Sequence, residues 1–162
     1  MGKILIIYDS KTGNTEKMAF AIADGVKKVE GINVDIKKAD RTNVTDLVDA
    51  SGIIIGSPTY YGQMSAKIKK LIDRSVDVHG KLEGKVGAAF TSSGGIAGGA
   101  ETTLLSILNA MLIHGMIISG RSNKEYYGAA AVGEPNKDEL ESCYDLGERT
   151  AKLVARIASP TE

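Results

Sequence analysis

Short apolar runs alternate with amphipathic stretches along the whole chain. Five of these runs are apolar on both faces or alternate as strands do, and they cover Lys3–Tyr8, Asn33–Lys38, Gly52–Gly56, Lys85–Thr91 and Met116–Ser119. Runs that are apolar on both faces are typical of parallel strands covered by helices on each side. The pattern therefore predicts a buried parallel sheet.

Between these runs, apolar residues recur at every third or fourth position, which predicts helices. The expected helices cover Thr15–Glu30, Asp46–Ala50, Ser65–Ser75, Glu101–His114 and Lys137–Ile157. Strand and helix alternate, so we expect an α/β protein with an open five-stranded parallel sheet wound on both faces. The one long connection after the last strand is Gly120–Asn136. No break in composition and no repeat suggests a second unit, so residues 1–162 are expected to form a single domain.

Composition narrows the classes of function. Lys and Arg together number 20 and so do Asp and Glu, which gives a formal net charge of zero and argues against a nucleic-acid binder. Cys143 is the single cysteine, as expected in a reducing cytoplasm. The apolar runs are too short to span a bilayer and no targeting segment is evident, so we expect a cytoplasmic protein without membrane insertion. No cluster has metal-ligand spacing, so no metal is expected.

In folds of this class, ligands bind beyond the carboxyl ends of the strands. The first loop after a strand reads DSKTGNTE (Asp9–Glu16) and leads directly into a helix, whose N-terminus favours an anion. Gly13 permits a turn that aims N–H groups at one point. The side-chain donors of this loop are Ser10, Thr12, Asn14 and Thr15. The spacing is neither that of a triphosphate loop nor that of a dinucleotide loop, which favours a phosphomonoester; a helix cap with a turn is the alternative.

The second loop, SPTYYGQMS (Ser57–Ser65), follows the third strand. Pro58 fixes the direction of the chain, and Gly62 can adopt conformations closed to other residues. Tyr60 and Tyr61 are adjacent and could stack on a flat ring system. The alternative is that both tyrosines only cover an edge of the sheet.

The third loop, TSSGGIAGGAE (Thr91–Glu101), follows the fourth strand and holds four glycines within six residues. Such a backbone can approach a flat ligand closely and present bare N–H and C=O groups. A flexible surface linker is the alternative, although the loop joins a buried strand to a helix.

These three loops resemble those of the flavodoxins. DSKTGNTE resembles their phosphate loop, GSPTYYG their second FMN loop and TSSGGIAGG their third. The resemblance covers nearly the whole chain, and it implies a flavodoxin-like sheet of order 2-1-3-4-5 with FMN as cofactor. The chain is most similar to the WrbA-type NAD(P)H:quinone oxidoreductases, in GSPTYYGQMSAKIKKLID, in Glu101 and Thr102 after the third loop, in HGM (His114–Met116) and in YGAAAVG (Tyr127–Gly133).

The resemblance also implies roles for residues. The first loop would bind the FMN phosphate, the tyrosines of the second loop with Thr59 would pack on the isoalloxazine and ribityl, and Ser92–Gly95 would hydrogen-bond the pyrimidine side. The expected cofactor-binding residues are Ser10, Lys11, Thr12, Gly13, Asn14, Thr15, Pro58, Thr59, Tyr60, Tyr61, Gly62, Ser92, Ser93, Gly94, Gly95, Gly98 and Gly99. His114 would be catalytic, lining the site where a nicotinamide or quinone stacks on the flavin. Without the resemblance, His114 is a residue that caps a helix end.

Two functions remain open from the sequence. One is an electron carrier that exchanges electrons with a redox partner protein, and the other is an enzyme that passes a hydride from NAD(P)H through FMN to a quinone. The HGM and YGAAAVG segments favour the enzyme. The resembling reductases are usually longer, with an insertion before the third strand and a longer segment after the fifth, so the short length of this chain favours the carrier. A homo-oligomer, dimer or tetramer, is compatible with the resemblance. Four cations on one predicted helix form a solvated face or attract an acidic partner or a cofactor phosphate, and they are Lys67, Lys69, Lys70 and Arg74.

Overall fold

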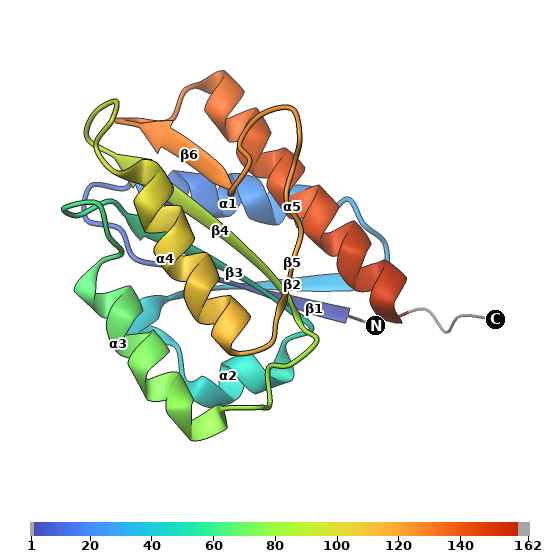
Figure 1. Ribbon diagram of the computed structural model, residues 1–162. Coiled ribbons are helices and arrows are strands. Elements are labelled where there is room, and N and C mark those ends of the chain that lie inside the picture. The colour runs from blue at the N-terminus through green and yellow to red at the C-terminus, as the bar shows by residue number, and fades with distance from the viewer. Residues whose placement is uncertain (1, 159–162) are drawn as a thin grey trace.

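A parallel sheet runs through the centre of the computed structural model, which describes residues 2–158 (Figure 1). Its strands are β1 (Gly2–Tyr8), β2 (Ile32–Lys38), β3 (Gly52–Pro58), β4 (Val86–Ser93), β5 (Ile117–Ile118) and β6 (Ala129–Val132). The strand order is β2-β1-β3-β4-β5, and every pairing is parallel. The predicted α/β class and the order 2-1-3-4-5 are confirmed.

The fifth position of the sheet is filled by two segments instead of one. β5 pairs only with Val86 and Gly87 at the start of β4, and β6 pairs with Phe90–Ser93 at its end. The sequence pattern placed β6 inside the Gly120–Asn136 connection. β4 has eight residues and β5 only two, so the carboxyl-terminal half of β4 needs a second partner, and the chain returns to supply it.

Helices cover both faces of the sheet (Figure 1). They are α1 (Asn14–Val26), α2 (Val44–Asp49), α3 (Ala66–Arg74), α4 (Ala100–Ile113) and α5 (Lys137–Ala158), with short 3₁₀ turns at Ala39–Arg41 and Ser75–Val78. The apolar sides of α1 and α5 form one core layer with the sheet, and those of α2, α3 and α4 form the other. Within residues 2–158, no helix has the length and apolar character needed to cross a membrane.

Two glycines bring α1 and α5 into backbone contact. A Cβ atom on Gly147 of α5 would overlap the carbonyl oxygen of Ile22, and one on Gly25 of α1 would overlap the carbonyl oxygen of Tyr144. Because each helix presents a glycine to the other's backbone, the two axes approach more closely than larger residues would allow.

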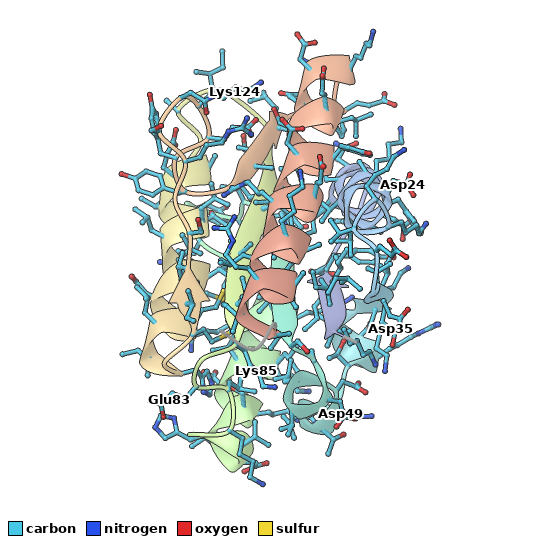
Figure 2. The ribbon with its side chains drawn as sticks, turned by 90° about the vertical axis from the view of Figure 1, so that its right-hand side faces the viewer. Asp24, Asp35, Asp49, Glu83, Lys85 and Lys124 are labelled. Atoms are coloured by element: carbon cyan, nitrogen blue, oxygen red, sulfur yellow. The ribbon has the colours of Figure 1, made fainter. Side chains whose placement is uncertain are left out.

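Lys85 lies directly before β4, at the edge of the sheet opposite the three loops, and links this edge to the end of α2. Its ammonium group donates to the carbonyl oxygens of Val48 at 2.8 Å and Ala50 at 2.5 Å, which terminates α2. Figure 2 shows Lys85 and Asp49 in the same lower part of the view. Burial lowers the pKa of Lys85, and Asp49 partly opposes that change.

Candidate functional site

The three loops lie together at the carboxyl ends of β1, β3 and β4, on the left of Figure 1. Between them is a hollow of about 310 Å³, called the main hollow below. Its walls are formed by Ser10, Lys11, Thr12, Asn14, Thr15, Pro58, Thr59, Tyr60, Ser92, Ser93, Gly94 and Gly133. These residues, all within the described part of the chain, carry hydroxyl, amide and ammonium groups but no carboxylate, so the hollow suits an anion.

The first loop is shaped by its own hydrogen bonds. Gly13 has a φ of +94° immediately before α1, and its N–H donates to Ser10 Oγ at 3.1 Å. Thr15 is buried, and its Oγ1 lies 2.8 Å from Oγ of Ser92 in the third loop. The hydroxyl pair therefore joins two walls of the main hollow.

Replacing Thr15 with valine is expected to lower the free energy of unfolding by about 1–3 kcal/mol, because the Ser92 hydroxyl loses its buried partner. FMN affinity should fall as well, since the two loops are no longer tied together. Urea denaturation and flavin titration measure the two effects. Thr45→Val, at an exposed position of α2, is the matched control and should change neither quantity. Equal effects of both substitutions would contradict the role assigned to Thr15.

A second network lies behind the first loop. The Tyr8 hydroxyl, at the end of β1, donates to the carboxylate of Glu16 in the first turn of α1, and Lys38 lies 3.8 Å from the same carboxylate. Burial, together with the hydrogen bond to Glu16, raises the pKa of Tyr8 to about 12. Tyr8 thus remains a hydrogen-bond donor and holds the Glu16 carboxylate in place next to the turn at Gly13.

The second loop is a tight turn whose tip faces solvent. Tyr60 and Gln63 exchange two backbone hydrogen bonds of 3.0 Å, and the two residues between them have positive φ, +52° at Tyr61 and +73° at Gly62. The Tyr61 side chain is fully exposed, whereas Tyr60 lines the main hollow. Only one of the two predicted aromatic contacts is therefore part of the hollow's wall.

The third loop packs against the second at glycine. Gly99 has a φ of +96°, and a Cβ atom there would overlap Cα of Gly62. Thr102 Oγ1 donates to the carbonyl oxygens of Gly62 at 2.7 Å and Gly99 at 3.0 Å, so it links both loops. This contact sets the distance between the two walls of the main hollow.

The structure brings eleven of the predicted cofactor-binding residues to the wall of the main hollow. The others lie in the same three loops but do not line it, and they are Gly13, Tyr61, Gly62, Gly95, Gly98 and Gly99. Gly133, directly after β6, also lines the hollow and was missed. The YGAAAVG segment was a usable signal, because its alanines form β6 and bring Gly133 to the same edge of the sheet.

His114 is not brought to the main hollow. α4 begins beside the third loop, and its 14 residues place His114 at the far end of the helix, about 20 Å away. The Ser75 hydroxyl donates to the carbonyl oxygen of Ile72 at 2.6 Å, so its oxygen accepts from His114 Nε2–H at 2.7 Å. Nδ1 is buried without a partner among residues 2–158, and the His79 ring lies 5.6 Å away. Within one chain, His114 therefore cannot meet a ligand of the main hollow.

The environment of His114 predicts a pH-dependent stability. Burial lowers the pKa of His114, and nearby His79 lowers it further. The unfolded chain therefore binds the proton more readily, so this contribution to stability is present above the unfolded value of about 6.5 and is lost as the pH falls through the folded pKa. Unfolding free energies from urea titrations at about pH 7.5 and about pH 5.5 should differ more in the wild type than in His114→Gln. The same difference in both proteins would contradict this assignment.

A second hollow of about 410 Å³, called the side hollow below, adjoins the main one. Its walls are formed by Asp9, Ser10, Lys11, Tyr60, Ser65, Ala66 and Lys67. Ser10, Lys11 and Tyr60 are shared with the main hollow. Both hollows therefore border the first and second loops, and the side hollow also borders the start of α3.

Comparison with known proteins agrees with this geometry. The family model described as NADPH-dependent FMN reductase matches residues 2–124. A flavodoxin from Aquifex aeolicus is 41% identical, with 96% of this chain and 88% of that protein aligned. An NAD(P)H dehydrogenase (quinone) from Archaeoglobus fulgidus is 37% identical over 97% of this chain and all of its own length. The crystal structure of a flavodoxin, WrbA-like protein from Agrobacterium tumefaciens has a TM-score of 0.82 and 26% identity, covering 96% of this chain and 99% of that one.

The fold and the three loops define an FMN-binding, flavodoxin-like redox protein. The chain belongs to the NADPH-dependent FMN reductase family. The residues present fit the cofactor, because uncharged donors line the main hollow at the start of α1 and the second and third loops contact each other closely at Gly62 and Gly99.

Proposed function

We propose that the protein is an NAD(P)H:quinone oxidoreductase that uses FMN. The observation that supports this proposal is the side hollow, which opens beside the main hollow and shares Ser10, Lys11 and Tyr60 with it. An enzyme of this kind needs room for a second ligand next to the flavin, whereas a carrier that meets only protein partners does not.

Residues of the three loops would bind different parts of FMN and orient it. The donors of the first loop would hold the FMN phosphate, and Thr59 and Tyr60 would face the ribityl and the ring. Ser92, Ser93 and Gly94 would present polar groups to the pyrimidine side. Bound FMN supplies the redox chemistry, and these residues supply its position and its electrostatic surroundings.

Steady-state oxidation of NADH and NADPH by the FMN-loaded protein, with a benzoquinone as acceptor, tests the proposal. We expect turnover that depends on both FMN and quinone. Negligible turnover with both nucleotides would overturn the proposal. His114→Ala is the informative variant, because its side chain could reach a flavin only in another copy of the chain. A loss of turnover in that variant, together with a dimer or tetramer in solution, would support the predicted catalytic role of His114.

An electron carrier is the second candidate, and the exposed tip of the site favours it. Tyr61 of the second loop and Ile96 of the third are almost fully exposed large side chains next to the main hollow. Such residues commonly contact protein partners. A carrier would show slow turnover with NAD(P)H but fast reduction by a flavodoxin reductase, and Tyr61→Ser with Ile96→Ser would slow that reduction.

A further inference from the structure

Three exposed cations form a stripe along α3, called the basic stripe below. Lys67, Lys70 and Arg74 follow one another at intervals of three and four residues, so they lie on the same flank of the helix. Lys67 lies 3.5 Å from the Asp40 carboxylate and 3.7 Å from that of Asp9. Lys70 and Arg74 form no ion pair among residues 2–158. Like charges at this spacing repel one another, so the stripe carries positive charge that the chain itself does not neutralise.

Carboxylates gather on the other side of the sheet. The segment Glu134–Glu148, which includes the beginning of α5, has six carboxylates and one cation, whereas α3 has four cations and one carboxylate. The two helices belong to different core layers and cover opposite faces of the sheet (Figure 1). The formal net charge of zero therefore hides a separation of charge across the molecule. A molecule that approaches the three loops meets positive charge on the α3 side and negative charge on the α5 side.

The tips of the second and third loops add an apolar contact beside the basic stripe. Tyr61 and Ile96 are almost fully exposed, and the second loop leads directly into α3. Arg74 lies seven residues beyond Lys67, about 10 Å further along the helix. A protein interface of standard size covers about 800 Å² on each partner. One partner protein can therefore contact both the loop tips and the basic stripe.

We propose that the basic stripe docks an acidic protein that donates single electrons to bound FMN. Apolar side chains at the centre of a contact and charged groups at its rim are typical of protein interfaces, and the opposite charges would steer the two proteins together. A nucleic acid fits less well, because its phosphates would also meet the carboxylates of Glu134–Glu148.

The electron transfer balances without a further reagent except water. One electron leaves the reduced centre of the donor protein, which is oxidised by one electron, and enters FMN. Two such transfers, with two protons taken from water, complete the reduction of one FMN. The inference needs bound FMN but no quinone, so it goes beyond the proposed function by adding a protein donor.

Stopped-flow mixing of the FMN-loaded protein with a reduced plant-type ferredoxin, an acidic iron–sulfur protein, tests the proposal. The second-order rate constant of flavin reduction should fall about tenfold or more between about 20 and about 300 mM NaCl, because salt screens the attraction between exposed charges. At low salt, Lys70→Gln combined with Arg74→Gln should lower the rate constant by about threefold to tenfold. Lys28→Gln combined with Lys152→Gln removes two exposed cations from the side of α1 and α5. This matched control should leave the rate constant unchanged.

The outcomes distinguish a docking site from a general effect of charge. A rate constant that does not depend on salt, or that falls equally in the α3 double variant and in the matched control, overturns the proposal. Cytochrome c is basic, so the reduced α3 double variant should pass electrons to it at least as fast as the reduced wild type does. Slower transfer to cytochrome c would mean that the substitutions damage the flavin site, and it would also overturn the proposal.

Two further controls complete the test. The affinity for FMN should be the same in the wild type and in both double variants, because neither removes a residue of the main hollow. Binding of a DNA oligonucleotide that depends on Lys70 and Arg74, without an effect of these residues on electron transfer, would show a general polyanion site and overturn the proposal. The ferredoxin assay contains neither NAD(P)H nor a quinone, so its failure and the failure of the proposed function can be told apart.

Discussion

Replacing Gly147 with alanine is expected to lower the free energy of unfolding by about 3 kcal/mol or more, although alanine is the better helix former. The added methyl group would overlap the Ile22 carbonyl oxygen of α1, and a backbone atom cannot turn aside as a side chain can. The helices would have to separate along their whole contact. Because α1 begins at the first loop, FMN affinity should fall with the stability.

Chemical denaturation of Gly147→Ala, Gly25→Ala and Gly120→Ala measures this effect. Gly25→Ala should behave like Gly147→Ala, since its methyl group would overlap the Tyr144 carbonyl oxygen. Gly120 is the matched control, because a Cβ there meets only one atom, at an ordinary 3.8 Å, and its φ is not positive. A Gly147→Ala protein as stable as the wild type would contradict the inference that the backbones of α1 and α5 are in contact at this position.

The sheet could be predicted from the sequence because each main strand is recognisable from its own short run of residues. Runs such as Lys3–Tyr8 and Gly52–Gly56 are apolar on both faces, and this pattern needs no knowledge of the rest of the chain. Strand order followed from the resemblance. β6 was not predicted because three of its four residues are alanine, which has little strand propensity, and only the pairing with β4 makes the segment a strand.

The helix contact could not be predicted from the sequence. Gly25 and Gly147 are 122 positions apart, and each alone looks like a residue that weakens its helix. Their role appears only when α1 and α5 lie side by side.

The position of His114 could have been inferred. In a parallel α/β sheet, helices begin near the carboxyl ends of the strands and run back to the other edge. A histidine at the end of a predicted helix of about four turns must therefore lie far from loops that precede that helix. The prediction that His114 lines the flavin site followed the resemblance instead of this geometric argument. The argument applies within a single chain.

The largest loss of FMN affinity is expected from Gly99→Ala, which should raise the dissociation constant about hundredfold or more. Alanine is strained at the φ of +96° found there, and its methyl group would overlap Cα of Gly62. The second and third loops would move apart, and the Thr102 hydroxyl could no longer reach the Gly62 carbonyl oxygen. The wall residues Tyr60 and Ser92 would then lose the spacing that a flat ring requires.

Fluorescence titration of FMN with the purified apoprotein gives this dissociation constant, and Gly120→Ala serves again as control. Riboflavin separates the two halves of the site, because it lacks the phosphate that the first loop would bind. Gly99→Ala should lower the affinities for riboflavin and FMN by similar factors, because it changes the part of the site that would hold the ring, which both ligands share. Thr15→Val changes the first loop, which would bind the phosphate. It should therefore lower the affinity for FMN more than the affinity for riboflavin. A Gly99→Ala protein that binds FMN as the wild type does would mean that the Gly62–Gly99 contact does not shape the flavin site.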